Sequence, residues 1–317
     1  MRFKATSSVK AEIAILRISN THTNEFVEIL PTMGTRVHKL YLQRGNRVCS
    51  VLEEKDLSEK SLNLFPFHGA KLSPFSNRIE DGKYVFNDTV FKLEKNFIEE
   101  QNACHGFIYK NLFEIVDEKM TGDFGQVTFR LDYDGRTKGY PFPFRIDLTY
   151  RLESDRGLTC ITKIFNTGQT PMPVSDGWHP YISIGGKVDD WLVRFNAKER
   201  VVVDQRMIPT GQKIAFNDFS VFKKIGDTSF DTCFVICSNR NLHKTKIRSE
   251  EKDLTVVVWQ ETGEKKYNYL QVYTPKERNS IAIEPMTGIP NAFNNKEGLI
   301  VLDKGEWFEG SYGINIE

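Results

Sequence analysis

The chain has 317 residues, enough for one large domain or two ordinary ones. Its 43 basic and 42 acidic side chains leave a formal net charge of +1, without a long block of like charge, so the composition predicts no binding to nucleic acid. With a mean hydropathy of -0.42 and no apolar run of bilayer length, the sequence also argues against a membrane-spanning protein.

Short runs rich in β-branched and aromatic residues predict β-strands from the N-terminal third onward. They are separated by turn signals such as "TMG", "RGN", "YDG", "NTGQT" and "ETGE". The pair of runs in "KYVFNDTVFKL" predicts a hairpin with a tight turn at Asn87-Asp88. The predicted strands cover residues 25–30, 36–42, 83–86, 89–93, 126–133, 144–153, 158–165, 200–204, 254–259, 269–274, 280–284 and 299–302.

Helical periodicity is nearly absent, and only two short stretches, 52–61 and 216–226, favour a helix. Many strands with almost no helices indicate an all-β fold, an antiparallel sandwich or barrel. No repeat or Pro/Ser-rich linker divides the chain, so we predict a single domain over residues 1–317. The five cysteines lack zinc-type spacing and no signal-peptide apolar run is present, which predicts a cytoplasmic protein.

Two of the six histidines stand out as candidates for chemistry. His179 lies in "DGWHPY", where the following proline disfavours the helical region and is expected to end the sheet ladder. His105 lies in "NACHGF", at the foot of a strand-like run. Glu284 ends the alternating run "SIAIE" and also precedes a proline, so it is expected to leave the core face at a strand end. The simpler alternatives are a hydrogen-bonded core histidine and a solvated glutamate.

Polar and aromatic residues suited to a small ligand surround these candidates in the sequence. Asn77 and Arg78 follow a loop punctuated by glycine and proline, and a planar guanidinium there suits hydroxyls or a carboxylate. Asp231 precedes an apolar strand, whose start it marks in the simpler interpretation. Trp178 and Tyr181 flank His179, and aromatic faces stack on the C–H faces of sugar rings. Most of the other aromatic rings are expected in the core.

Several familiar catalytic motifs do not occur in the sequence. It contains no phosphate-binding loop, dinucleotide fingerprint, H-E-x-x-H or G-x-S-x-G pattern. The expected chemistry is therefore proton transfer without a cofactor, a metal or a covalent intermediate.

Taken together and in order, these segments resemble the aldose 1-epimerase (galactose mutarotase-like) family. The resemblance rests on seven segments spread over nearly the whole chain, each weak alone. They are "EFVEILPTMGTRVHKLYL", "SPFSNRIEDGKYVFND", "CHGF", "GWHPYISI", "RVVVDQRMIPTGQ", "SFDTCFV" and "IAIEPMTGIPNAFN". The resemblance implies a large antiparallel β-sandwich, called a supersandwich, with the sugar in an open groove. It also implies turnover of a monosaccharide without any cofactor. We expect a monomer or a homodimer, and the sequence leaves the choice open.

Carried over residue by residue, the resemblance implies that Glu284 is the general base and His179 the general acid. It further implies that His105 assists and that Arg78 and Asp231 orient the sugar. Glutamate is ionised at neutral pH, and a neighbouring carboxylate such as Asp176 is expected to raise the histidine pKa modestly. The reverse roles would require strong desolvation of the glutamate.

The sequence departs from the family pattern at three places. Phe107 replaces the second glycine of the first histidine motif, "GYPFPF" lacks the glycine that is common after "GYP", and "WHPYISI" replaces "NHSYFNL". These departures leave the identity of the sugar open. One alternative is a hexose-6-phosphate 1-epimerase, for which Arg36, Arg44 or Lys71 would bind the phosphate. Another is a carbohydrate-binding protein without catalysis. A glycoside hydrolase, which needs two acting carboxylates, ranks last.

Overall fold

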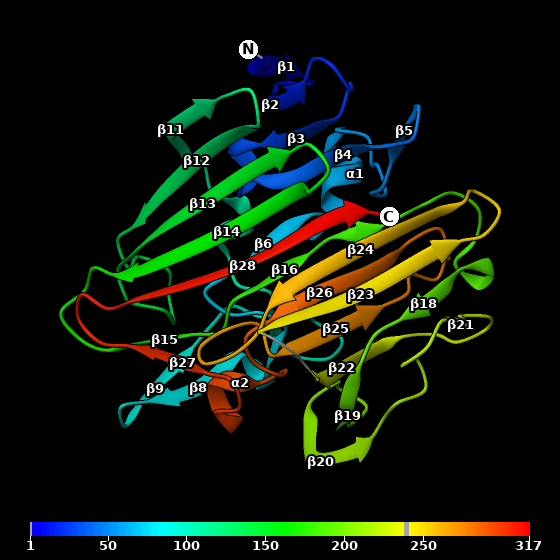
Figure 1. Cartoon of the computed structure of the whole chain (residues 1–317). Helices are drawn as coiled ribbons and strands as arrows, with labels where there is room; N and C mark the ends of the chain where they lie inside the picture. The colour runs from blue at the N-terminus through cyan, green and yellow to red at the C-terminus, as the bar shows by residue number, and fades with distance from the viewer. Residues whose placement is uncertain (1, 238–240) are drawn as a thin grey trace.

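Antiparallel β-sheets form nearly the whole of the computed structural model, which describes residues 2–237 and 241–317 (Figure 1). The largest sheet has nine strands. In spatial order they are β11 (Glu114–Met120), β12 (Phe124–Tyr133), β13 (Phe144–Glu153), β14 (Gly157–Asn166), β28 (Trp307–Ile316), β24 (Leu254–Glu261), β23 (Leu242–Ser249), β18 (Leu192–Arg194) and β21 (Lys223–Lys224).

An eight-stranded sheet lies behind it in Figure 1 and carries the candidate site. Its strands run in the order β20 (Pro209–Ala215), β19 (Ala197–Val203), β22 (Asp231–Ile236), β25 (Tyr269–Tyr273), β26 (Ile281–Met286), β16 (Gly177–His179) and β6 (Ala70–Leu72), with β17 (Tyr181–Ile182) also paired to β26.

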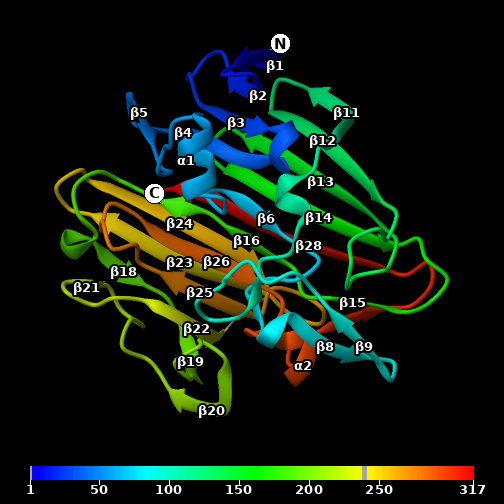
Figure 2. The same ribbon diagram turned by 180° about the vertical axis from the view of Figure 1, so that it is seen from behind.

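A five-stranded sheet lies against β11 and β12 at one end of the molecule in both views (Figures 1 and 2). It comprises β1 (Phe3–Lys10), β2 (Ile13–Asn20), β3 (Phe26–Leu30), β4 (Arg36–Arg44) and β5 (Arg47–Ser50). Three two-stranded ribbons complete the strands: β7 (Arg78–Ile79) with β10 (Ala103–Cys104), β8 (Lys83–Phe86) with β9 (Thr89–Lys92), and β15 (Met172–Val174) with β27 (Ile300–Leu302).

The core lies between the two large sheets, and along their strands the buried side chains that face it alternate with half-buried ones. Strand β13 shows this most clearly, with every second side chain buried along its whole length. Tyr150 of β13 and Tyr312 of β28 pack against Trp178 of the eight-stranded sheet, with ring centroids 6.0 and 5.0 Å away. All predicted strand runs overlap a strand, and the predicted antiparallel all-β sandwich is confirmed. The single domain over residues 1–317 stays a prediction.

Local predictions succeeded at the hairpin and largely failed for helices. The turn at Asn87-Asp88 joins β8 to β9, and both residues have positive φ, as a two-residue hairpin turn requires. The helix predicted over 52–61 begins only at residue 59, as α1 (Glu59–Leu64), where the Ser58 side chain caps it. No helix forms over 216–226, which holds turns and the short strand β21. A four-residue helix, α2 (Ala292–Asn295), was not predicted.

The remaining helical segments are single 3₁₀ turns at η1 (Pro31–Met33), η2 (Glu80–Gly82), η3 (Ile108–Lys110) and η4 (Val188–Asp190). Within residues 2–237 and 241–317, no helix has both the length and the apolar character needed to cross a bilayer.

Candidate functional site

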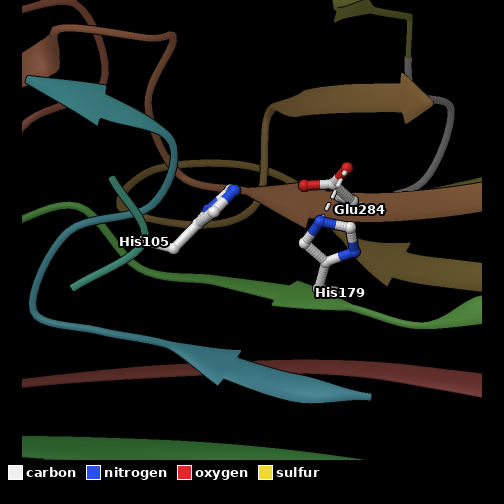
Figure 3. A group of neighbouring side chains, drawn as sticks. All are labelled: His105, His179 and Glu284. Carbon is white, nitrogen blue, oxygen red and sulfur yellow. Dashed lines mark ion pairs between the residues drawn. The ribbon is translucent and has the colours of Figure 1, made fainter. Parts of the chain in front are cut away.

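Three ionisable side chains that are distant in the sequence meet in the floor of one groove (Figure 3). His179 ends β16, Glu284 lies in the neighbouring strand β26, and His105 follows β10. The Nε2 atom of His179 lies 3.5 Å from Oε1 of Glu284, and the two imidazole centroids are 5.2 Å apart. The carboxylate and the imidazole are therefore close together, as the sequence interpretation requires, and their joint contact with one sugar ring stays a prediction.

The environment of Glu284 differs from the predicted strand end. Strand β26 continues through Pro285 to Met286, so the proline does not end the ladder there as predicted. The Glu284 side chain is only 2 % exposed, which excludes the alternative of a solvated glutamate. All six residues of β26 are buried, and Glu284 is the one among them that lines the groove. At His179 the prediction holds, since β16 ends before Pro180.

His105 is held in a fixed orientation by the backbone of Asn77. The amide N–H of Asn77 donates to Nδ1 of His105 over 3.2 Å, and the amide of His105 donates to the Asn77 carbonyl over 3.0 Å. Both residues adopt positive φ, 58° and 66°, a conformation that is uncommon outside glycine and is found at functional sites. Burial lowers the pKa of His105 to about 3, aided by Arg78. The ring is therefore neutral, and its proton is on Nε2.

Burial also shifts the pKa values of the two central groups, away from the charge states that the sequence predicts. It raises the pKa of Glu284 well above its usual value, with a contribution from Asp231 and an opposing one from Arg78. Burial lowers the pKa of His179 well below its usual value, and His105 adds to this effect. We had predicted an ionised glutamate beside a histidine with a raised pKa. The enclosed site instead favours the neutral pair, a carboxylic acid beside a neutral imidazole.

Hydrogen-bonding residues cover one side of the trio. Arg78 approaches Asp231 with 3.8 Å between Nη2 and Oδ2, and Gln271 donates to Oδ1 of Asp231 over 2.6 Å. Asn77 donates to Oε1 of Gln271 over 3.4 Å. The sequence interpretation missed Gln271, which sits directly opposite Glu284 in the β25–β26 register. Only strand pairing reveals that position.

Aromatic rings and a third histidine also border the trio. Tyr181 lies between the rings of His68 and His179, parallel to both, with centroids 3.7 and 4.8 Å away. His68 donates from Nε2 to Glu53 over 2.8 Å if its neutral tautomer carries the proton there. Phe67 lies 4.7 Å from the His105 ring and lines the same groove. No sequence pattern points to Glu53, His68 or Phe67, because none of them lies in a motif.

Several buried side chains of the site have unused hydrogen-bonding capacity. Among the described residues, Nε of Arg78, Nδ1 of His179 and Oε2 of Glu284 have no hydrogen-bond partner. Such buried orphans are rare in folded proteins and mark places where a bound molecule can complete the bonding. The groove of about 750 Å³ that these residues line is in the size range of small-molecule sites.

Trp178 does not face this groove, and its predicted contact with sugar is corrected here. The side chain is fully buried on the core face of β16, opposite to His179, because successive strand residues alternate. Its Nε1 donates to the Tyr267 hydroxyl over 3.2 Å, and the Lys71 ammonium lies 4.3 Å from its ring centroid. Asp176 is also on the core face, where it pairs with Lys71. The predicted pairing of Asp176 with His179 is therefore wrong.

Lys71 and Asp176 form a fully buried ion pair on the core side of the strands that carry the trio. Burial lowers the pKa of Lys71 to about 8, and Asp176 opposes the shift. The Tyr267 hydroxyl donates to Asp176 over 2.8 Å, and Asp176 and Thr287 exchange two further bonds that join β16 to the end of β26. Asp176 therefore links the strands that carry His179 and Glu284 through its backbone, while its carboxylate pairs with Lys71 of β6.

Removing one member of this pair is expected to destabilise the protein strongly. Lys71→Met should lower the free energy of unfolding by about 3–5 kcal/mol, because the buried Asp176 carboxylate loses its partner. Denaturant unfolding followed by circular dichroism measures the change. Lys60→Met, at an exposed position of α1, is the matched control and should change stability by no more than about 0.5 kcal/mol. Equal stability of the two variants would contradict the structural role.

The residues considered for phosphate binding do not reach the trio. Arg36 donates to the Pro66 carbonyl over 2.9 Å, and Arg44 approaches Asp253, away from the groove. Lys71 is buried in the core. The three cations that were named as candidates therefore do not converge near the trio.

The trio also has the composition of a metal site, since ligand atoms of His105, His179 and Glu284 lie within 4.8 Å of one another. The bond from the Asn77 amide to Nδ1 leaves the His105 proton on Nε2, and a protonated nitrogen cannot bind a metal. The three residues fit hydrogen bonding to a hydroxylated ligand better than metal binding. Independence from a metal stays a prediction.

Comparisons with known proteins identify the relatives of this chain. The family model described as aldose 1-epimerase matches residues 17–315. The uncharacterized protein YihR of Escherichia coli is 28% identical over 245 residues, 75% of each chain. An aldose 1-epimerase of Streptococcus thermophilus is 24% identical over 270 residues, 73% of each chain.

Solved structures show the same fold. A galactose mutarotase-like protein of Clostridium acetobutylicum superposes with a TM-score of 0.87 at 22% identity, covering 100% of this chain and 99% of that one. The galactose 1-epimerase of Lactobacillus acidophilus gives a TM-score of 0.82 at 17% identity, with 99% of each chain covered. Because the family model spans nearly the whole sequence, the chain belongs to the aldose 1-epimerase family.

Proposed function

We propose that this protein is an aldose 1-epimerase that interconverts the α and β anomers of an unphosphorylated hexose. The observation that carries the proposal is the 3.5 Å approach of His179 Nε2 to Glu284 Oε1 in a groove floor that also presents Arg78 and Asp231. Anomerisation requires proton transfer at the C1 hydroxyl and at the ring oxygen. These two oxygens are bonded to the same carbon, so neighbouring acid and base groups can serve both.

In the proposed mechanism, Glu284 takes the proton of the C1 hydroxyl while His179 gives a proton to the ring oxygen. The bond between C1 and the ring oxygen then breaks and leaves an open-chain aldehyde. After rotation about C1–C2, the ring oxygen attacks the other face of the carbonyl, His179 recovers its proton and Glu284 returns the other. The protein ends in its starting state. Fixed positions for acid and base replace the chance encounter that slows the reaction in water.

The reacting form of the couple has a carboxylate on Glu284 and a proton on His179. It contains the same single proton as the neutral pair that burial favours in the enclosed site. Sugar hydroxyls that donate to Oε2 of Glu284, an orphan acceptor, would favour the carboxylate and so the reacting form. Neutral His105 would donate from Nε2 to the substrate, and Arg78 and Asp231 would orient its hydroxyls.

Two further functions were left open by the sequence. For the phosphosugar reaction, none of the three cations that were considered for phosphate binding lines the groove. A carbohydrate-binding protein without catalysis does not account for the close pairing of an acid and a base. The proposal therefore favours catalysis on a neutral sugar, with the trio and Asn77, Arg78, Asp231 and Tyr181 as the residues in contact with it.

Polarimetry of freshly dissolved α-D-glucose and α-D-galactose tests the proposal. We expect the purified protein to accelerate the approach to anomeric equilibrium in proportion to its concentration, for at least one of the two sugars. A parallel measurement on glucose 6-phosphate separates the phosphosugar alternative. Acceleration only with the phosphorylated sugar, or with no hexose at all, would overturn the assignment.

A further inference from the structure

The imidazole of His179 is oriented without a hydrogen bond to its second nitrogen. Its Nε2 faces Glu284, and within the described part of the chain its Nδ1 has no hydrogen-bond partner (Figure 3). A histidine that transfers protons is usually fixed by a carboxylate or carbonyl bonded to that other nitrogen. His179 instead has two nearly parallel aromatic neighbours, Tyr181 at 4.8 Å and 7° and Phe67 at 6.3 Å and 13°. Aromatic packing therefore holds the ring in place.

The stack continues from Tyr181 to a third ring, that of His68, which is bonded to Glu53. The His68 and Tyr181 rings are only 3.7 Å apart and are inclined by 4°. Nε2 of His68 lies 2.8 Å from Oε2 of Glu53. Burial opposes the charge on Glu53, but hydrogen bonds from His68, Lys55 and Ser280 outweigh it and lower the carboxyl pKa to about 2. Because an ionised carboxylate can only accept, His68 is the donor in this bond.

The Glu53 carboxylate is a fixed support for this stack. Lys55 donates to its Oε1 over 2.7 Å, and the Ser280 hydroxyl donates to its Oε2 over 2.8 Å. Both carboxylate oxygens therefore have a partner besides His68, and the side chain is only 13% exposed. Hydrogen bonds to a charged acceptor are stronger than neutral ones, so the carboxylate holds the His68 ring firmly.

Main-chain bonds join the same segments to the strands of the site. The amide of Glu53 donates to the carbonyl of Tyr181 over 2.9 Å. The amide of Gly69, which follows His68, donates to the carbonyl of His179 over 3.0 Å. Side-chain and main-chain contacts thus connect the same residues, and a change at either supporting residue reaches the His179 ring through Tyr181.

We propose that Glu53 and His68 are positioning residues for the proton transfer by His179. This inference rests on the proposed function. The hydrogen bond from His68 to Glu53 fixes the plane of the imidazole, and that plane supports the ring of Tyr181. Tyr181 in turn keeps Nε2 of His179 directed at Glu284. Because a displacement of about 1 Å can cost about 10²-fold in rate, a loosened stack lowers kcat more than it weakens sugar binding.

The first test removes and then restores the ring at position 68. His68→Ala should lower kcat for mutarotation by about tenfold and change KM by less than about threefold. His68→Phe restores a planar ring in the stack and should keep kcat within about threefold of the wild type. His22→Ala, at an exposed position outside the groove, is the matched control and should alter neither constant. An unchanged kcat in His68→Ala, or an equal loss in His68→Phe, would overturn the inference.

A second test asks whether Glu53 acts through His68. Glu53→Ala should lower kcat in the wild type but not in the His68→Phe background, since phenylalanine has no hydrogen bond to the carboxylate to lose. Glu53→Gln keeps the shape of the side chain and should give the same pattern with a smaller loss. Circular dichroism shows which variants are folded. Equal losses in both backgrounds would remove Glu53 from the positioning.

NMR of the histidine ring protons separates this inference from the proposed function, because it needs no turnover. Protons above an aromatic face are shielded by its ring current, so release of Tyr181 in His68→Ala should move the His179 signals downfield. His68→Phe should bring them back, and their absence in His179→Asn identifies them. If no sugar is turned over, the proposed function fails and these signals still decide the positioning. Unchanged signals in folded His68→Ala would overturn it, whether or not sugars react.

Discussion

Glu284→Gln is expected to lower kcat for mutarotation by about 10²–10⁴-fold, the contribution of one positioned proton-transfer group. Glutamine keeps the shape of the side chain but can neither take nor return the proton of the C1 hydroxyl. His179→Asn should cause a loss of similar size, because it removes the partner that serves the ring oxygen. Sugar affinity should stay measurable in both variants, since Arg78 and Asp231 remain. Polarimetry measures the rates, and calorimetric titration measures the binding.

A control for these variants comes from the rim of the same groove. Glu277→Gln makes the same chemical change at an exposed position and should leave kcat within about twofold of the wild type, as expected for a surface substitution. Circular dichroism should show that all three variants are folded. Rates close to the wild type in folded Glu284→Gln or His179→Asn would remove that residue from the mechanism.

Activity is expected to fall on both sides of a pH plateau. The active couple holds one proton. Burial lowers the pKa of His179, so the couple gains a second proton only below the usual histidine value of about 6.5. Burial raises the pKa of Glu284, so the couple loses its last proton only above the usual glutamate value of about 4.3. The rate should therefore drop about tenfold per pH unit beyond each edge.

The profile of kcat/KM against pH measures these edges, after subtraction of the uncatalysed rate in the same buffers. The alkaline edge is the informative one. Ordinary pKa values for both groups would leave the couple without its proton above pH about 6.5, so activity that persists above this pH would indicate a raised Glu284 pKa. A rate without an edge on each side would contradict a couple that acts with a single proton. Circular dichroism across the same pH range excludes unfolding as the cause.

Local patterns predicted the strands because their information is contained in adjacent residues. The alternation in β13 follows from one buried face, and the Asn87-Asp88 turn follows from the tolerance of both residues for positive φ. Helices were predicted poorly since the segment 216–226 has too few residues to show a helical period reliably. Its apolar side chains are instead explained by packing, as Phe219 stacks near Phe195 and Phe230 in the core.

The sequence interpretation misplaced Trp178 and missed Gln271 for the same reason, because adjacent residues do not reveal which face or partner a strand residue has. Strand alternation sends Trp178 to the core although His179 beside it faces the groove, and the sequence does not state which face is which. Gln271 became visible as a site residue only through its register opposite Glu284. The sequence also placed Asp176 beside His179, whereas in the fold its carboxylate pairs with Lys71.

The sequence by itself determined the all-β class, the family and the residue types suited to proton transfer, because motifs and strand periods are local. The tertiary structure decided that His179 and Glu284 lie 3.5 Å apart, and that the space around them is enclosed. It therefore also decided the directions of their pKa shifts, which depend on how much water the surrounding strands exclude. Desolvation is a sum over residues from many parts of the chain, and no short stretch of sequence contains it.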